Sequence, residues 1–281
     1  MNQHLKKIFN QMNQSKIDDF EGLSPSQIRN ILYSSYEENS IIKIKKEIKD
    51  NILNQIGFLK LTEYYLNFIL EQKEIKLTQR GYLPVKIVKE LYNTGFVPDE
   101  WIESGSFKLG KEMDSLVITL LRIISSISRF TKIRQNKLSL TGKGLQILKG
   151  KRSELLTEIL RTFCYKYNWA FFDGYGEHQT GQIGFGYTFF LLSEYGTEFH
   201  KTDFYAEKYL IAFPAVIEQF RNLSYKNSSP EAIKICYAVR TFDRFLKFFD
   251  LIEYAESKSR YRIIMIRKSD IFDKVIEIDL G

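Results

Sequence analysis

Apolar residues recur at every third or fourth position through several long segments of the chain, which is the spacing of an amphipathic helix. The clearest segment is 51–72, where this period runs from Ile52 to Ile69. Ser24 followed by Pro25 predicts the start of a short helix, because serine caps helices and proline suits their first turn. The same period predicts further helices over residues 84–95, 116–130, 153–166, 185–195, 203–213 and 231–249. The chain is therefore expected to be mainly helical.

Short β-hairpins are predicted between some of these helices. Ile75 and Leu77 alternate as in a strand, and residues 132–140 read as two strands around the polar turn 134–137. The order helix, strand or hairpin, helix thus occurs at 51–110 and again at 111–152. A looser third copy at 226–281 places a turn at 255–260 and a strand at 261–266.

Repetition of this order predicts tandem winged-helix-like units in a mainly α fold with short β-hairpins (α+β). The expected domains are listed in chain order: an N-terminal helical segment 1–50, a first winged-helix-like unit 51–110, a second and basic one 111–152, a helical, aromatic-rich middle region 153–225, and a C-terminal helix plus hairpin unit 226–281. The same order of helix, hairpin and helix also occurs in unrelated α+β proteins. An α+β fold without winged-helix units therefore remains an alternative.

The composition is that of a folded globular protein. With 281 residues, 44% of them apolar, the chain has material for two or three cores. No stretch approaches the 18 to 20 apolar residues of a membrane span, and the first residues lack the apolar core of a signal peptide. We therefore expect a cytoplasmic protein. Cys164 and Cys236 lie on apolar helical patterns without CxxC spacing, which predicts buried, reduced thiols.

Positive charge is concentrated in the first half of the chain. Residues 1–150 hold 23 Lys and Arg against 16 Asp and Glu, whereas residues 151–281 hold 18 of each. The run 115–153 contains nine cations and no acidic residue. Such a run attracts polyanions and is typical of nucleic-acid binding, but it also fits a solvated face or a surface that meets an acidic partner.

The segment 171–186 is the other candidate for chemistry. Its five glycines precede a predicted helix, yet the P-loop and dinucleotide patterns are absent, so we expect glycines that serve turns and close packing. His178 lies beside Glu177 and near Asp173, and His200 lies near Asp203. No metal-ligand spacing accompanies them, and surface or structural hydrogen bonding is the favoured role. Aromatic residues at 163–172 and 242–249 follow helical spacing and are expected to be core.

Joined together, several segments resemble an uncharacterised bacterial family, some of whose members are fused to SEC-C-type zinc-binding modules. The resemblance spans about residues 22–275 and rests on LSPSQIRNILY, KLTQRGYLPVKIVKELY, KLSLTGKG, YNW, GQIGFGYTFFLL, FYAEKYLIAFP and VRTFDRFLKFFDLIE. It implies a bacterial, cytoplasmic setting and transfers no activity and no site residue. This chain lacks the cysteine-rich zinc tail of the fused members.

Three functional hypotheses follow from the sequence. The favoured one is nucleic-acid binding, of DNA more than RNA, in a regulatory, mobile-element or defence role. Its phosphate-contacting residues would be Arg129, Lys132, Arg134, Lys137 and Lys143. The second is a protein interaction or scaffold module whose cations pair with an acidic partner. The third is an enzyme around Asp173, Glu177 and His178. No cofactor and no metal ion are expected.

Overall fold

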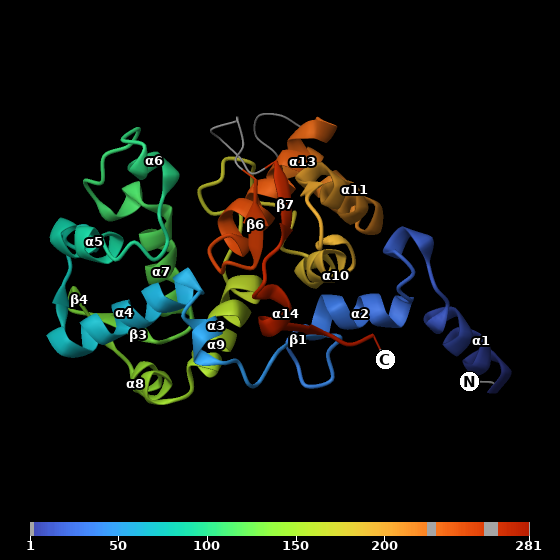
Figure 1. Ribbon diagram of the computed structural model, residues 1–281, viewed down its shortest axis with the longest axis horizontal. Coiled ribbons are helices and arrows are strands. Elements are labelled where there is room, and N and C mark those ends of the chain that lie inside the picture. Colours follow the sequence, from blue (N-terminus) through green and yellow to red (C-terminus); the bar gives the residue numbers. More distant parts are fainter. Residues whose placement is uncertain (1–2, 224–228, 256–263, 281) are drawn as a thin grey trace. The chain divides into compact units, whose positions relative to one another are not determined.

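The computed structural model describes residues 3–223, 229–255 and 264–280, which form two compact units. Unit 1 comprises residues 1–45 and 168–281, and unit 2 comprises residues 46–167 (Figure 1). Most residues of both units are helical, with short antiparallel strands between the helices. Of the helices in the described ranges, none is both long enough and apolar enough to span a lipid bilayer.

Unit 2 is a helical body with one small sheet. Its elements are α3 (Asp50–Leu53), α4 (Gly57–Gln72), β2 (Ile75–Lys76), α5 (Val85–Tyr92), α6 (Glu100–Glu103), a 3-10 turn (Glu112–Asp114), α7 (Leu116–Ile127), β3 (Thr131–Arg134), β4 (Lys137–Leu140), α8 (Gly142–Lys149) and α9 (Arg152–Tyr165). The sheet has the order β2-β4-β3 and is antiparallel throughout. The predicted hairpin and the predicted helices of this region are thus confirmed to within a few residues.

The segment predicted as one helix over 51–72 is divided into α3 and α4. Ile56 has an extended backbone, and α4 begins at Gly57, a residue that favours helices poorly. The hydrophobic period continues across the break because both helices bury their apolar residues in the same core, including Ile52 and Leu59. Periodicity alone does not detect such a break.

The two predicted winged-helix-like units, 51–110 and 111–152, both lie within unit 2. Their strands form a single sheet, because Ile75 of β2 pairs with Leu138 of β4. A strand of two residues cannot stand alone, and β2 obtains its partner from a hairpin some 60 residues further along the chain. The inner face of this sheet buries Ile75 and Leu138.

Unit 1 combines the first 45 residues of the chain with the residues from 168 onward. Its elements are α1 (Gln3–Gln14), a 3-10 turn (Asp18–Phe20), α2 (Pro25–Ser34), β1 (Ile42–Ile44), α10 (Phe185–Tyr195), β5 (His200–Lys201), α11 (Thr202–Ala212), α12 (Ala215–Leu223), α13 (Pro230–Ala238), a π-helix (Val239–Leu246), β6 (Ile252–Tyr254), β7 (Met265–Lys268), α14 (Phe272–Val275) and β8 (Ile276–Ile278). Strand β1 pairs with β8, so unit 2 is an insertion between β1 and the rest of unit 1.

The core of unit 1 is aromatic, as predicted for the middle region. Helix α10 buries every residue from Phe185 to Leu192, and the rings of Tyr209 on α11 and Tyr237 on α13 stack at 4.5 Å. A second sheet has the order β5-β7-β6. Residues 256–263, which hold most of the predicted turn and the start of the predicted strand 261–266, lie outside the described residues.

The predicted helix 231–249 changes character along its length. After α13, the turn widens into the π-helix, where the amide of Lys247 donates to the carbonyl of Phe242, five residues earlier. Long π-helices are rare and are often found where function or a special contact requires them. Here the wide turn carries Arg240 and Arg244, which both reach the glycine-rich loop.

Candidate nucleic-acid interface

The outer face of the unit 2 sheet is made of basic side chains. In β3 and β4, Arg134 is directly opposite Lys137, and Lys137 is directly opposite Lys76 of β2. Residues directly opposite one another point to the same face of a sheet, and Lys132 shares that face because it lies two residues from Arg134. Ser139, opposite Lys132, completes it. On the opposite face Thr131, Ile75 and Leu138 are buried, whereas Ile133 is half exposed. Lys76, Lys132, Arg134 and Lys137 are all exposed.

Three cations therefore stand side by side across three strands. Neighbouring strands are about 4.8 Å apart, so the row from Lys76 through Lys137 to Arg134 spans about 10 Å. Like charges directly opposite one another destabilise a sheet. In a structure that tolerates this repulsion, a bound anion would relieve it.

Glu74 neutralises part of the row. Its Oε2 lies 2.6 Å from Nζ of Lys137, and both side chains are about half exposed. An exposed pair of this kind contributes little to stability and exchanges readily with other ions. Within the described ranges Lys76, Lys132 and Arg134 form no ion pair, so the face remains positive.

The five residues predicted from the sequence are only partly brought together. Lys132, Arg134 and Lys137 share the outer face of the sheet. Arg129 is exposed in the turn between α7 and β3, where its carbonyl accepts from the Thr141 hydroxyl. Lys143 lies on α8, forms an ion pair with Glu158 and covers the ring of Phe130 at 5.4 Å. The structure therefore assigns three of the five residues to one surface.

Other cations of the acid-free run are engaged within unit 2. Nη1 of Arg122 lies 2.6 Å from the buried Glu112, and Nε of Arg152 lies 2.6 Å from Glu63. These acidic partners, Glu112 and Glu63, lie outside the run 115–153. The number of cations in the run therefore overestimates how many of them are unpaired. Lys76, in contrast, was not among the predicted residues. The alternation of buried Ile75 and exposed Lys76 was visible, but the strand that pairs with them was not.

The hairpin turn is held by unit 2 itself. Gln135 and Asn136 both have positive φ, as a two-residue type I′ turn requires. The side-chain amide of Asn136 donates to the carbonyls of Leu77 and Thr78, each at 3.1 Å, and the amide of Leu77 donates back to the Asn136 carbonyl. These bonds fix the tip of the hairpin against the loop after β2, so the basic face is a stable surface.

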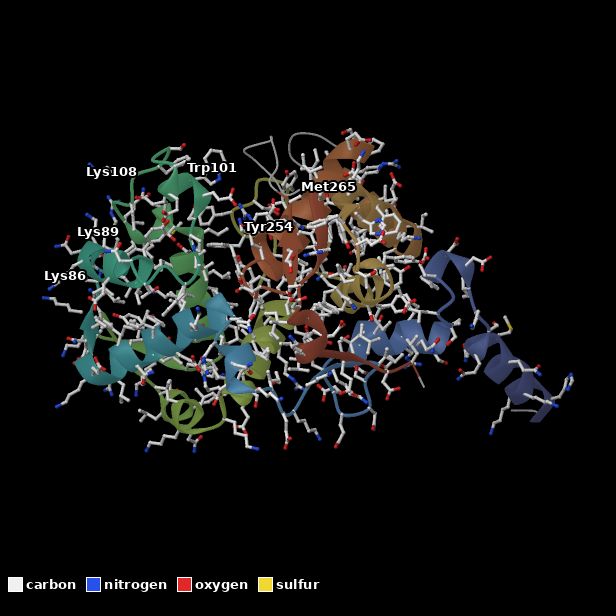
Figure 2. All side chains as sticks on the ribbon, in the orientation of Figure 1. Lys86, Lys89, Trp101, Lys108, Tyr254 and Met265 are labelled. Atoms are coloured by element: carbon white, nitrogen blue, oxygen red, sulfur yellow. The ribbon has the colours of Figure 1, made fainter. Side chains whose placement is uncertain are left out.

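Helix α7, which leads into the hairpin, contributes no cation to this surface. Most of its length is buried, including Ile118, Leu121 and Ile124. Two further lysines project from α5 instead, Lys86 and Lys89, and they extend away from the body of unit 2 (Figure 2). They border an open depression of about 530 Å³ that is also lined by Tyr64, Glu90, Asn93, Thr94 and Phe96.

The whole charge excess of the protein lies in unit 2. Its 122 residues hold 21 Lys and Arg against 13 Asp and Glu, a net charge of +8. Unit 1 holds 20 Lys and Arg against 21 Asp and Glu, a net charge of −1. The positive field therefore belongs to the unit that bears the basic sheet.

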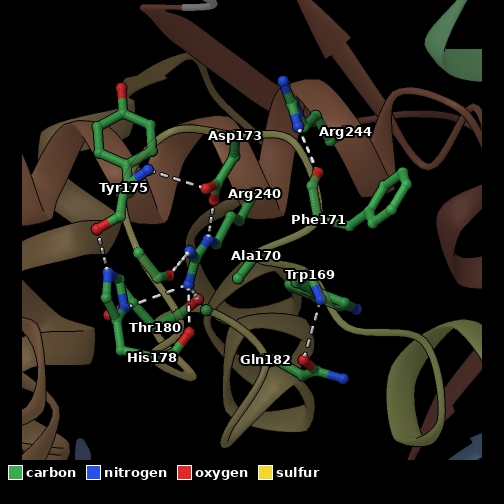
Figure 3. Close-up of polar contacts among 12 residues, drawn as sticks. Trp169, Ala170, Phe171, Asp173, Tyr175, His178, Thr180, Gln182, Arg240 and Arg244 are labelled. Carbon is green, nitrogen blue, oxygen red and sulfur yellow. Dashed lines mark hydrogen bonds and ion pairs between the residues drawn. The ribbon is translucent and has the colours of Figure 1, made fainter. Parts of the chain in front are cut away.

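Two of the three residues of the enzyme hypothesis, Asp173 and His178, belong to a buried network in unit 1 around Arg240 (Figure 3). Arg240 is 1% exposed, and its Nε donates to Oδ2 of Asp173, whose side chain is fully buried. Nη1 donates to the carbonyl of His178 at 2.5 Å, and Nη2 donates to the carbonyl of Gly176 at 2.9 Å. The other carboxylate oxygen of Asp173 accepts from the amide of Tyr175. Arg240 of the π-helix thus pairs with Asp173 of the loop.

His178 is also used internally. Nδ1 accepts from Nη1 of Arg240 at 3.2 Å and lies 2.8 Å from the Thr180 hydroxyl, so Nε2 bears the proton and donates to the carbonyl of Tyr175 at 3.2 Å. Burial, together with the positive charge of Arg240, lowers the pKa of His178 to about 4. The imidazole is therefore neutral near pH 7, and both ring nitrogens are occupied by the protein.

The remaining candidates lie apart from this network. Glu177 is exposed and accepts from the side-chain amide of Asn168 at 2.9 Å, and the ring of His200 stacks on Phe204 at 4.6 Å. Arg244 donates to the carbonyls of Phe171 and Phe172, which ties the start of the loop to the π-helix. Within the described ranges, no three His, Cys, Asp or Glu side chains are grouped so that they would hold a metal ion. The hydrogen bonds of Arg240 and Asp173 hold the loop in place on the π-helix.

Two glycines of the loop show why the segment needs them. Gly184 has φ +69, and a Cβ there would lie 2.7 Å from the ring of Phe213. At Gly186 a Cβ would lie 2.6 Å from Oγ of Ser35. Both contacts are too short for any larger residue, which confirms the turn and packing role that the sequence predicted.

The buried histidine predicts a specific pH dependence of stability. The unfolded chain binds a proton at His178 near pH 6.5, whereas the folded protein binds it only near pH 4. Stability is therefore lost as the pH falls through this window, by on the order of 3 kcal/mol at pH 4. Urea unfolding at pH 7, 5.5 and 4.5 measures this loss. The loss should be smaller in His178→Gln than in the parent. Equal pH dependence of the parent and His178→Gln would contradict the prediction.

Comparison of the chain with protein-family models, with curated proteins and with solved structures found no match. What the protein does is therefore to be inferred from the geometry and charge of its own residues, because a fold by itself does not define a function.

Proposed function

We propose that unit 2 is a winged-helix-like domain that binds nucleic acid, DNA in preference to RNA, on the outer face of its three-stranded sheet. The observation that supports this most is the row of Lys76, Lys137 and Arg134 across adjacent strands. A +8 unit with a four-cation face has both the long-range field and the local contacts that phosphates require.

The order of elements supports the winged-helix interpretation. A winged helix has a helix, a strand, two helices and a hairpin, and the first strand pairs with the last strand of the hairpin. Unit 2 has α4, β2, α5, α7, β3 and β4 in this order, with the short α6 and a 3-10 turn added between α5 and α7, and β2 pairs with β4. Domains built on a helix-turn-helix are used above all to bind DNA, which is why DNA is the first expected ligand.

The same comparison argues for contact through the sheet. In a helix-turn-helix, three or four residues join the two helices, and the second helix enters the major groove. Here 23 residues, 93–115, separate α5 from α7, and α7 is largely buried. Base reading by α7 is therefore not part of the proposal. The phosphate contacts are assigned to Lys76, Lys132, Arg134 and Lys137.

The direct test is binding of a fluorescently labelled 20-base-pair duplex to the full chain at increasing salt. Four phosphate contacts predict that log K falls against log salt with a slope of about −3 to −4. Fluorescence anisotropy at 50 to 300 mM NaCl measures this slope. No binding at micromolar protein and low salt would refute the proposal.

Glu74 provides a variant that should bind more tightly. Its carboxylate occupies Lys137, so an incoming phosphate must displace it. We expect Glu74→Gln to raise duplex affinity about threefold to tenfold at 50 mM salt, and the gain should shrink as salt screens the site. Glu71→Gln is the matched control, because Glu71 is exposed on α4 and makes no ion pair with the basic face. Equal gains in the two variants would mean that net charge alone is responsible.

A further inference from the structure

We infer that the ligand of the basic face is the sugar-phosphate backbone of a double helix, bound without reading its sequence. This inference rests on the proposed function and narrows its ligand. Two observations support it: the side chains of the face suit phosphates, and the amide of Asn136, which could read bases, is bonded to the protein backbone.

The face itself is suited to phosphates and unsuited to unpaired bases. Its side chains are Lys76, Lys132, Arg134, Lys137 and Ser139, all of which end in hydrogen-bond donors, and none of them has an aromatic ring. Proteins that prefer single strands place aromatic rings among their cations, because stacking contributes about 1 to 3 kcal/mol per base. A face without aromatic rings lacks this stacking energy, so it has no such preference for single strands.

One aromatic alternative within unit 2 is the depression beside α5. Its Phe96 ring is already covered by Nζ of Lys60, 4.8 Å from the ring centroid, and is met edge-on by Tyr64. A base would have to displace Lys60 to stack on that side of the ring. The depression therefore does not replace the stacking platform that the sheet lacks.

Charge density also favours a duplex. The four cations are clustered, with about 5 Å between neighbouring strands and about 7 Å between Lys132 and Arg134 along β3. Each phosphate contact releases about 0.9 counterion from a duplex and about 0.7 from a single strand. For four contacts, and with equal affinities at the 1 M salt reference, this difference makes the duplex the tighter ligand by about tenfold at 50 mM salt.

Groups that would read bases are few at this surface. Specific recognition uses paired hydrogen bonds from amide or guanidinium side chains to base edges. The amide of Asn136 is spent on the carbonyls of Leu77 and Thr78. That leaves the exposed amide of Gln135 at the tip of the hairpin and the guanidinium of Arg134, which is assigned to a phosphate. One amide and one guanidinium cannot define a binding site of several base pairs. Affinity is therefore expected to follow backbone charge and to ignore sequence.

The experiment compares three probes with the full chain at 50 mM salt: two 20-base-pair DNA duplexes of unrelated sequence, one AT-rich and one GC-rich, and a single strand of the first. We expect the duplex affinities to agree within about threefold and the single strand to bind about tenfold more weakly. Gln135→Ala should leave all three affinities unchanged.

A tenfold preference for one duplex, a single strand bound as tightly as the duplex, or a loss of affinity in Gln135→Ala would each overturn this inference while leaving nucleic-acid binding in place. Absence of binding to every probe would instead refute the proposed function itself. The two failures are thus distinguishable in one set of titrations.

Discussion

Replacing Arg240 with methionine is expected to lower the free energy of unfolding by about 3 to 5 kcal/mol. Methionine fills much of the space of the arginine stem, but it leaves the carboxylate of Asp173 buried without a counter-charge. It also removes the donors to the carbonyls of Gly176 and His178. An unpaired buried charge is far more costly than the loss of an exposed pair, so a large effect is expected.

Urea unfolding followed by circular dichroism measures this change. Arg267→Met is the matched control, because the Arg267–Glu253 pair is about 40% exposed and its loss should cost within about 1 kcal/mol. If Arg240→Met does not fold, the double variant with Asp173→Asn keeps the test open, because removing the uncompensated charge should recover part of the loss. A loss below about 1 kcal/mol in Arg240→Met would contradict the assigned role.

The second large effect concerns binding. Changing Lys76, Lys132 and Arg134 together to glutamate is expected to weaken duplex binding by at least about 100-fold at 50 mM salt, because three phosphate contacts and their released counterions are lost. The folded state should tolerate the change. All three side chains are exposed and make no ion pair in the described part of the chain.

A second variant with the same change in net charge distinguishes the loss of contacts at the sheet face from the loss of long-range electrostatic attraction. Lys86, Lys89 and Lys108 are also exposed, and they lie on α5 and in the segment before α7 (Figure 2). Changing these three to glutamate should weaken binding through the long-range field alone, by much less than the sheet variant. Unfolding curves for both variants verify that each is folded. Equal losses of affinity would show that the sheet face has no special role.

Sequence patterns were informative wherever local physics decides the outcome. The cap of Ser24 before α2 and the limits of α10 depend on neighbours within a few residues. The same holds for the hairpin 131–140, where a polar turn joins two short strands. Buried Cys164 and Cys236 and the aromatic core followed from apolar spacing.

Long-range pairing decided the rest. The sequence showed Ile75 as apolar and Lys76 as polar, but only the pairing of β2 with β4 places Lys76 beside Lys137 and Arg134. It showed nine cations without local acids, but Glu63, Glu74, Glu112 and Glu158, which approach four of them, lie outside the run. Charges interact through space, so a count along the chain cannot tell which of them are neutralised.

The sequence by itself determined that this protein is mainly helical, where most helices begin and end, and that its first half is basic. These properties come from backbone propensity, side-chain period and composition, all of which are local. Tertiary structure alone decided that one sheet unites β2 with the later hairpin, that its outer face gathers four cations, and that Arg240 holds Asp173 and the loop around it. Each of these contacts joins residues some 60 positions apart, and only the packing of a whole core brings such residues together.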